Sequence, residues 1–381
     1  MMPRSWDIFC SVVDNFGDIG VCWRLARRLS PGLGQNVRLW IDDLRSFQRL
    51  CAQVDVAKPV QRVGDVEVRH WPAAFPEITP ADIVVEGFGV RLPDNFIAAM
   101  AARRPPPVWI NLEYLSAEAW VDEHHGLPSP HPRLPLTKHF FFPGFTRSTG
   151  GVLIEDGLIE ARRAFQSSAD TAPAFRRAIG IHGDAGGSLW MSLFCYENAA
   201  LPGLIAAWAA DPKGVNCIVP AGHALSQIER IAGRRIALGT RAALGRLCLH
   251  AMPFLDFDQY DRLLWSCDLN FVRGEDSFVR AQLAARPLIW QAYPQDEEAH
   301  LRKTAAFAAR YTHAMAASEA NACGRLFDGW NRQTVDCGAA WPDYRNCLEK
   351  FAANALDWAG QVAENGDLAA NLAKFCEDRL E

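Results

Sequence analysis

The stretch Asp14-Asn15-Phe16-Gly17-Asp18-Ile19-Gly20 stands between an apolar run at 8–13 and a helical pattern at 21–29. A strand, a glycine-containing turn and a helix in this order place the turn at the carboxyl edge of a parallel sheet, where open α/β sheets bind their ligands. Two carboxylates four residues apart suit a cationic or proton-losing partner and would repel an anionic one. The stretch therefore predicts an α/β fold with an acidic ligand site after the first strand.

Strand and helix patterns alternate in both halves of the chain. In the first half we expect strands at 6–13, 37–41, 66–71, 82–87 and 107–112, with helices at 21–30 and 94–103. In the second half we expect strands at 188–195, 215–219, 247–252, 269–272 and 287–291, with helices at 200–210, 224–231, 258–266 and 277–285. Short apolar runs separated by helices are typical of parallel sheets.

The remaining segments suggest how the chain is divided. A length of 381 residues favours two domains. The small, polar stretch 166–187 reads as the linker, the proline-rich stretch 126–150 as a long irregular loop, and the tail 343–381 as helical. Neither half carries G-x-G-x-x-G or G-x-x-x-x-G-K-[ST], which disfavours a nicotinamide dehydrogenase and a P-loop NTPase.

Composition excludes several classes of protein. The net charge of −5 and the pI of about 6.1 do not fit a nucleic-acid binder. No apolar run is long enough to span a membrane, and the start of the chain shows no signal-peptide pattern. The eleven cysteines are scattered without a C-x-x-C pair, so we expect reduced thiols, a cytoplasmic location and no metal site.

A second strand, glycine turn and helix follow one another at 270–281, and this segment contains Arg273-Gly274-Glu275-Asp276-Ser277. Asp276 or Ser277 is expected to cap the helix, whose free N–H groups and positive dipole end would bind a diphosphate without a lysine. A carboxylate beside that diphosphate would accept hydrogen bonds from a ribose. In the alternative interpretation, the two residues only cap the helix and Glu275 is solvated.

Aromatic residues follow other strands at the same expected edge. Phe194 and Tyr196 end the strand at 188–195, and Phe254 follows the strand at 247–252. Core packing is the competing interpretation for Phe194, whereas the Tyr196 hydroxyl needs a polar partner at the strand end. The ring of Phe254 could contact a nucleobase.

Three long segments together resemble one family, the bacterial elongation factor P arginine rhamnosyltransferases. They read D-N-F-G-D-I-G-V-x-W-R-L-A-R at 14–27, F-V-R-G-E-D-S-F-V-R-A-Q at 271–282 and Y-P-Q-D-E-x-x-H-L at 293–301. The resemblance covers most of the chain and implies a GT-B glycosyltransferase, in which two Rossmann-like domains face a central cleft. By this resemblance, residues 1–170 form the acceptor-binding domain and residues 186–355 the nucleotide-sugar domain, while helices at 356–381 pack back towards the N-terminal domain.

The resemblance also implies the substrates and the roles of individual residues. The donor would be dTDP-β-L-rhamnose, the acceptor one arginine of elongation factor P, and the reaction would invert the anomeric carbon without a metal ion or other cofactor. Asp14 and Asp18 would bind the acceptor, with Asp18 as the base, and Asn15, Phe16 and Gly17 would border the sugar. The donor would be bound by the residues Phe194, Tyr196, Phe254, Arg273, Gly274, Glu275, Asp276 and Ser277. One position departs from the family pattern, because Phe257 stands where glutamine is usual.

Two other functions remain open from the residues alone. One is a GT-B enzyme that uses another sugar nucleotide or a small acceptor such as a lipid or saccharide. The other is a nucleotide-sugar-binding protein without catalytic activity, although such a sensor would have no use for the carboxylates at 14 and 18. The basic pairs at 103–104 and 234–235 are too short for a membrane-binding surface.

Overall fold

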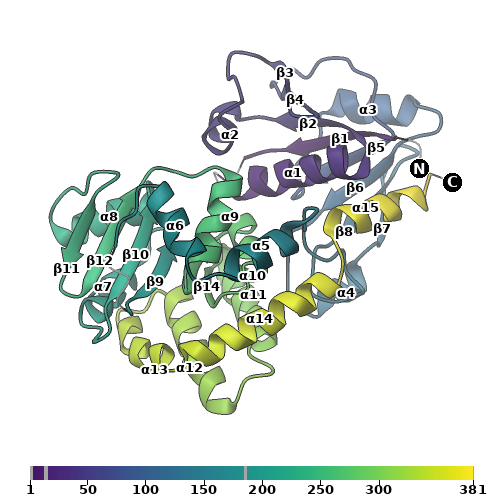
Figure 1. The fold of residues 1–381 in the computed structure, drawn as a ribbon. Coiled ribbons are helices and arrows are strands. Elements are labelled where there is room, and N and C mark those ends of the chain that lie inside the picture. The colour runs from purple at the N-terminus through teal and green to yellow at the C-terminus, as the bar shows by residue number, and fades with distance from the viewer. Residues whose placement is uncertain (1–2, 13–15, 184–186, 381) are drawn as a thin grey trace. The chain divides into compact units, whose positions relative to one another are not determined.

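The computed structural model describes residues 3–12, 16–183 and 187–380, and the chain forms two compact units (Figure 1). The first unit combines Met1–Asp156 with Val362–Glu381, and the second is Gly157–Gln361. Each unit is built on its own sheet, in which most strands are parallel. The chain therefore leaves the first unit once and returns to it at the end.

The first sheet has the strand order β3-β4-β2-β1-β5-β6-β8-β7 in the described part of the chain. Its inner strands are parallel, and β3 and β7 pair antiparallel at the two edges. The chain runs from β1 to one side and then returns to β5 on the other, so the strand order reverses between β1 and β5. The strands are β1 (Ser5–Cys10), β2 (Asn36–Ile41), β3 (Val60–Val63), β4 (Val66–His70), β5 (Ile83–Gly87), β6 (Val108–Leu112), β7 (Pro128–Pro130) and β8 (Thr137–Phe141).

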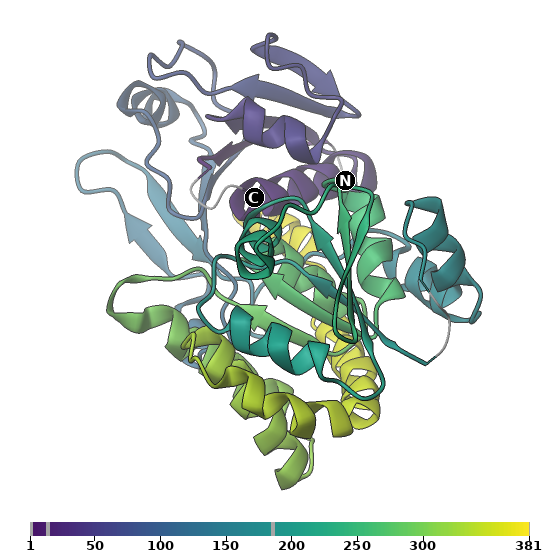
Figure 2. The ribbon, with the colours of Figure 1, turned by 90° about the vertical axis from the view of Figure 1, so that its left-hand side faces the viewer.

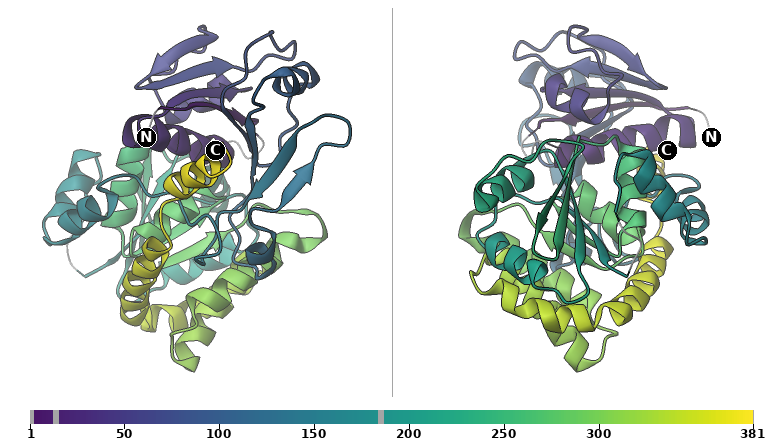
Figure 3. Two further views of the ribbon diagram at one scale, coloured as in Figure 1. Left: turned by 90° about the vertical axis from the view of Figure 1, so that its right-hand side faces the viewer. Right: turned by 60° about the vertical axis from the view of Figure 1, so that its left-hand side comes forward.

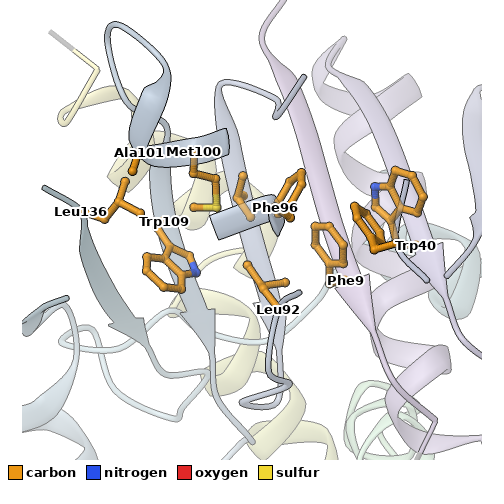
Figure 4. Packing of buried hydrophobic residues seen from close by; sticks show 10 residues of the cluster. Phe9, Trp40, Leu92, Phe96, Met100, Ala101, Trp109 and Leu136 are labelled. Atoms are coloured by element: carbon orange, nitrogen blue, oxygen red, sulfur yellow. The ribbon is translucent and has the colours of Figure 1, made fainter. Parts of the chain in front are cut away.

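An aromatic core holds α3 (Asp94–Ala102) against this sheet (Figure 4). Phe9 of β1 contacts Phe96 of α3 at 4.9 Å between ring centroids and Trp40 of β2 at 5.7 Å. Because the first residues of the core come from β1 and β2, the same packing fixes the strand that leads into α1. The other helical segments of the unit are α1 (Gly17–Arg27), η1 (Arg28–Gly32), α2 (Leu44–Leu50), α4 (Trp120–His124) and α15 (Leu368–Glu377).

The second sheet has the strand order β11-β12-β10-β9-β13-β14, with β11 antiparallel at one edge. Here the order reverses between β9 and β13. The strands are β9 (Leu189–Leu193), β10 (Val215–Pro220), β11 (Arg241–Leu244), β12 (Leu247–Met252), β13 (Leu269–Arg273) and β14 (Leu288–Gln291). The helical segments are α5 (Leu158–Gln166), α6 (Thr171–Ala178), α7 (Leu201–Ala209), α8 (His223–Ala232), α9 (Phe257–Ser266), α10 (Asp276–Leu283), η2 (Asp296–Glu298), α11 (Ala299–Tyr311), α12 (Ala317–Asn331), η3 (Cys337–Ala340), α13 (Trp341–Asn346) and α14 (Leu348–Glu364).

Helices cover both faces of the second sheet (Figure 2). On one face, α9 packs on Trp190, Ile218 and Met252. On the other, Phe271 of β13 contacts Trp208 of α7 at 5.5 Å and Trp330 of α12 at 5.3 Å. The sheet is therefore buried on both sides, which is why its strands read as continuous apolar runs in the sequence.

The predicted strands and helices lie where the sequence placed them, with shifts of a few residues at their ends. The prediction of an irregular loop at 126–150 was wrong, because this segment contains β7 and β8. The linker predicted at 166–187 contains α6, whose Phe175 contacts Phe165 of α5, and Phe165 in turn contacts Trp265 of α9. The eleven cysteines are not joined by disulfide bonds, and most of them are buried.

The C-terminal segment completes the first unit. Arg28 Nε donates to Asp367 Oδ2 at 2.9 Å, and the Leu368 N–H donates to the Val152 carbonyl at 2.9 Å. Figure 3 (left) shows α15, in yellow, beside the purple α1. The first unit therefore depends on residues from both ends of the chain.

Candidate active site

In the first unit, α1 starts directly after the loop that follows β1, and it carries the first group of candidate residues. Phe16 is the N-cap, Gly17 the first helical residue, and both are half-buried. Asp18 lies in the first turn and is buried, with 2% of its surface exposed. A carboxylate at this position is stabilised by the free N–H groups and the positive dipole end of the helix. Asp14 and Asn15 lie outside the described residues.

The Asp18 carboxylate has a partner from another strand. The hydroxyl of Tyr114, which follows β6, donates to Asp18 Oδ1 at 3.2 Å. The Tyr114 ring stacks on Phe88, which follows β5, with 4.4 Å between ring centroids. Phe88 has a φ of 61°, a left-handed conformation that is uncommon for an aromatic residue. The start of α1 and the loops after β5 and β6 thus meet at this carboxylate.

Further polar groups lie at the same edge of the first sheet. Asn111 donates to Glu113 at 2.6 Å and accepts from the Gly89 N–H at 3.0 Å. Glu86 is buried and accepts from Lys138 Nζ at 2.7 Å. Burial raises the pKa of Glu86, and the Lys138 ammonium opposes this rise. These bonds fix the loops that carry Phe88 and Tyr114.

In the second unit, a cation lies between two aromatic rings. Arg273 ends β13, is 5% exposed, and places its guanidinium carbon 4.6 Å from the Phe194 ring centroid and 4.2 Å from that of Tyr196. Phe194 and Tyr196 follow β9, the strand next to β13. Contacts of this kind are cation–π interactions, and they fix the direction of the guanidinium. Phe194, Tyr196 and Arg273, three of the predicted donor residues, are therefore neighbours, as expected for residues at the carboxyl edge of a parallel sheet.

The turn between β13 and α10 begins at Gly274, whose φ of 63° favours glycine. Glu275 is the N-cap of α10, without a side-chain cap bond, and Asp276 is the first helical residue. The prediction that Asp276 or Ser277 is the cap was therefore wrong. The hydroxyl of Ser277 instead donates to the Arg273 carbonyl at 2.5 Å, which ties the turn to the end of β13. Glu275 and Asp276 are half-buried beside the positive end of the helix.

Phe254 extends the aromatic group. Its ring is 6.0 Å from that of Phe194, which in turn lies 6.1 Å from Tyr260 of α9. Burial raises the pKa of the Tyr260 phenol, so this side chain stays neutral. Phe257, the residue that departs from the family pattern, is 7% exposed at the start of α9.

The residues around Asp18 in the first unit and those around Arg273 in the second form two groups, which differ in what they can bind. The second offers a fixed guanidinium, a helix N-terminus and two carboxylates, which suit the phosphates and the sugar hydroxyls of a nucleotide. The first offers a buried carboxylate held by a phenol, which suits a cation or an abstracted proton. No group of three or more metal-binding side chains lies together in the part of the chain that the structure describes. Nor does any helix within the described ranges have the length and apolar character to cross a membrane.

Both groups lie where the strand order reverses, between β1 and β5 and between β9 and β13. Sequence reasoning found the residues after β1, β9 and β13 but missed Phe88, Tyr114 and Tyr260. The first two directly follow predicted strands at 82–87 and 107–112, so the carboxyl-edge rule would have found them. Tyr260 lies inside a helix, where no such signal exists.

The comparisons with known proteins agree with one another. The family model for the Elongation-Factor P (EF-P) rhamnosyltransferase EarP matches residues 6–377. The protein-arginine rhamnosyltransferase of Pseudomonas putida is 44% identical over 380 residues, which covers 100% of both chains. The protein of the same name from Shewanella oneidensis is 37% identical over 384 residues, covering 97% of each.

Solved structures give the same result for the fold. A structure that describes EarP-mediated arginine glycosylation of translation elongation factor EF-P aligns with a TM-score of 0.71 and 32% identity, over 98% of this chain and 99% of that one. Anabaena HepE in complex with UDP-glucose aligns with a TM-score of 0.52 over 99% of both chains, at 12% identity, and supports the GT-B fold alone. The chain thus belongs to the EF-P rhamnosyltransferase family EarP and is a glycosyltransferase of the GT-B fold.

Proposed function

We propose that this enzyme transfers rhamnose from dTDP-β-L-rhamnose to a guanidino nitrogen of one arginine in translation elongation factor P, with inversion of the anomeric carbon. The observation that carries the proposal is the buried Asp18 carboxylate at the start of α1, bonded to Tyr114. An acidic group in this position suits a guanidinium acceptor. Because the acceptor is a translation factor, we place the reaction in the cytoplasm.

The acceptor explains why a carboxylate is needed. Arginine is a poor nucleophile because its pKa is above about 12, so full deprotonation at pH 7 costs on the order of 8 kcal/mol. We infer that Asp18, together with Asp14, binds the guanidinium and directs one nitrogen at the anomeric carbon. As the C–N bond forms and the bond to the diphosphate breaks, Asp18 takes the proton, a general-base contribution of roughly 10²–10⁴-fold. The acidic site would also attract a basic acceptor loop.

The proposed donor accounts for the residues around Arg273 in the second unit. Arg273 and the N–H groups at the start of α10 would stabilise the departing dTDP, while Glu275 and Asp276 would accept from the ribose. These groups supply positive charge from the chain itself, so the proposed step needs no metal and no cofactor. A single displacement inverts the anomeric carbon and needs no covalent enzyme intermediate. The proposed donor side chains are Phe194, Tyr196, Phe254, Arg273, Gly274, Glu275, Asp276 and Ser277, and Asn15, Phe16 and Gly17 would border the sugar.

Mass spectrometry tests the reaction directly. Incubation of the protein with dTDP-β-L-rhamnose and elongation factor P should add one deoxyhexose to an arginine of the acceptor. Asp18→Asn should lower turnover by roughly 10²–10⁴-fold while dTDP-rhamnose binding, measured by calorimetry, stays nearly unchanged. A fully active Asp18→Asn would remove the base assignment. Modification with a different sugar nucleotide, or of a small acceptor only, would favour the other glycosyltransferase functions, and nucleotide binding without transfer would favour a sensor.

A further inference from the structure

Two loops that carry proposed donor residues, those after β9 and β13, are connected to one helix end, either directly or through β14 and the loop that follows it. The helix is α12, which ends at Asn331. None of the donor residues lies on α12 itself. Its last residues nevertheless make several buried hydrogen bonds to these loops.

Asn331 holds the exit of β14. It is 4% exposed, and its amide nitrogen donates to the Trp290 carbonyl at 2.8 Å and to the Phe327 carbonyl at 2.9 Å. Its amide oxygen accepts from the Ala292 N–H at 3.2 Å. One buried side chain thus contacts the backbone on both sides of Gln291, just before Tyr293, whose ring meets that of Tyr196. Buried backbone groups that lose such partners are costly.

Asn198 holds the exit of β9 to the same helix end. It is fully buried, and its amide nitrogen donates to the Trp330 carbonyl at 2.9 Å. Gln227 of α8 fixes the Asn198 backbone from the other side, accepting from its N–H at 2.9 Å and donating to its carbonyl at 2.6 Å. The residue lies two positions after Tyr196, so it sets where the Tyr196 loop leaves the sheet.

Gln333 makes a third contact and adopts an unusual backbone conformation. It follows the end of α12 with a φ of 56°, a position at which helices usually have glycine. Its side-chain oxygen accepts from the Ala199 N–H at 3.2 Å. A glycine would relieve the backbone strain but could not make this bond, so the glutamine is explained by the loop that it holds rather than by the helix.

One further bond joins the end of β14 to the loop after β9, and another joins β14 to the turn at Arg273 and Gly274. The side-chain oxygen of Gln291 accepts from the Tyr196 N–H at 2.9 Å, and Trp290 Nε1 donates to the Gly274 carbonyl at 2.7 Å. From this network we propose that Asn331, Asn198 and Gln333 are positioning residues, which set the spacing of the loops after β9 and β13 so that Tyr196 and Arg273 meet the nucleotide sugar in one geometry. The proposal rests on the proposed donor function of these loops.

We call these three positioning residues, Asn331, Asn198 and Gln333, the clamp. Asn331→Leu tests the clamp against a matched control. Leucine has a similar volume but cannot bond to Ala292 or Trp290. Asn354→Leu, in α14 of the same unit, also removes a bond from an asparagine amide to a backbone carbonyl, that of Tyr311 at 3.0 Å. We expect the Kd for dTDP-rhamnose to rise about tenfold or more in Asn331→Leu and less than about twofold in Asn354→Leu. Hydrogen exchange at the Ala292 and Tyr196 amides should accelerate in the first variant only.

Gln333→Gly separates positioning from simple stability. Because glycine tolerates a positive φ, the melting temperature should stay the same or rise, while the Kd for dTDP-rhamnose should rise about threefold. A purely structural role would not weaken donor binding while the melting temperature is unchanged or higher. This variant is also expected to fold if Asn331→Leu does not.

The outcomes distinguish the two proposals. If the wild-type protein does not bind dTDP-rhamnose, the proposed function fails and the clamp fails with it. If the wild-type protein binds but Asn331→Leu and Gln333→Gly bind equally well, the donor assignment stands and the clamp is wrong. Weaker donor binding in both variants, with unchanged binding in Asn354→Leu, supports the clamp.

Discussion

The Asp18 carboxyl group and the Tyr114 hydroxyl are 96 positions apart in the sequence and 3.2 Å apart in the fold. A hydrogen bond to a charged acceptor is roughly twice as strong as one between neutral groups. The phenol therefore holds Oδ1 of the carboxylate that we propose binds the acceptor guanidinium. In the proposed reaction Tyr114 does not exchange a proton, so it positions the base.

Tyr114→Phe should separate this role from substrate binding. Loss of one bond to a charged group is worth about 1.5–3 kcal/mol, which corresponds to a fall in kcat of roughly ten- to a hundredfold. The KM for either substrate should change little, because the ring and its stacking on Phe88 remain. Steady-state kinetics measure both constants. Tyr344→Phe, which removes a buried hydroxyl in the second unit, is the control and should leave kcat unchanged. Equal kcat values for Tyr114→Phe and the wild type would rule out the positioning role.

At the scale of elements, the sequence predicted where strands end but not how the following turns are capped. The turn at Gly274 and the start of α10 were found because a strand, a glycine and a helix follow in order. The wrong cap has a physical cause, since Ser277 can bond either to a helix N–H or to the carbonyl of Arg273, and tertiary packing decides between them. Sequence alone does not contain that choice.

The missed strands have a similar explanation. The prolines of 126–150 normally argue against a strand, yet β7 has three residues at the sheet edge, where a missing N–H costs little. The contact of Tyr114 with Asp18 could not be predicted from the local pattern either, because it joins the start of α1 to the loop after β6. Thus the supersecondary order was predictable, whereas the partners across loops depend on the sheet order.

Glu275→Ala should affect the donor through the start of α10. Glu275 is half-buried at the N-cap of α10, beside the turn at Gly274. If its carboxylate accepts from the ribose, the Kd for dTDP-rhamnose should rise roughly tenfold, the loss of one charge-assisted hydrogen bond. Calorimetry gives this value. Glu349→Ala, an exposed acidic residue in the first turn of α14, is the matched control. Unchanged affinity in Glu275→Ala would count against the nucleotide role.

At the scale of the whole molecule, the first unit closes only when the last twenty residues return to it. The returning chain passes so close to Gly151 that a Cβ there would lie 2.4 Å from the Gly366 carbonyl oxygen. Gly151 also has a φ of 74°, so both the close approach of Gly366 and the backbone conformation require glycine here. The same C-terminal segment bonds to Arg28, the residue just after α1, so the stability of the first unit depends on C-terminal residues.

Asp367 is the residue through which this dependence can be measured. Its carboxylate caps α15 at the Ala369 and Ala370 N–H groups, accepts from the Ile154 N–H at 3.1 Å, and pairs with Arg28, with 12% and 11% of the two side chains exposed. Asp367→Ala removes all of these bonds and leaves Arg28 its pair with the exposed Asp156.

Because a lost cap costs about 1 kcal/mol and a broken buried ion pair costs more, Asp367→Ala should lower the free energy of unfolding by about 2–4 kcal/mol. Asp367→Asn keeps the cap and should lose about half as much. Asp343→Ala, which breaks an exposed pair with Arg325, should cost less than about 1 kcal/mol. Urea denaturation measures all three. If Asp367→Ala is no less stable than Asp343→Ala, the C-terminal segment does not hold the first unit together, and the support of α1 must come from the β1–β2 core alone.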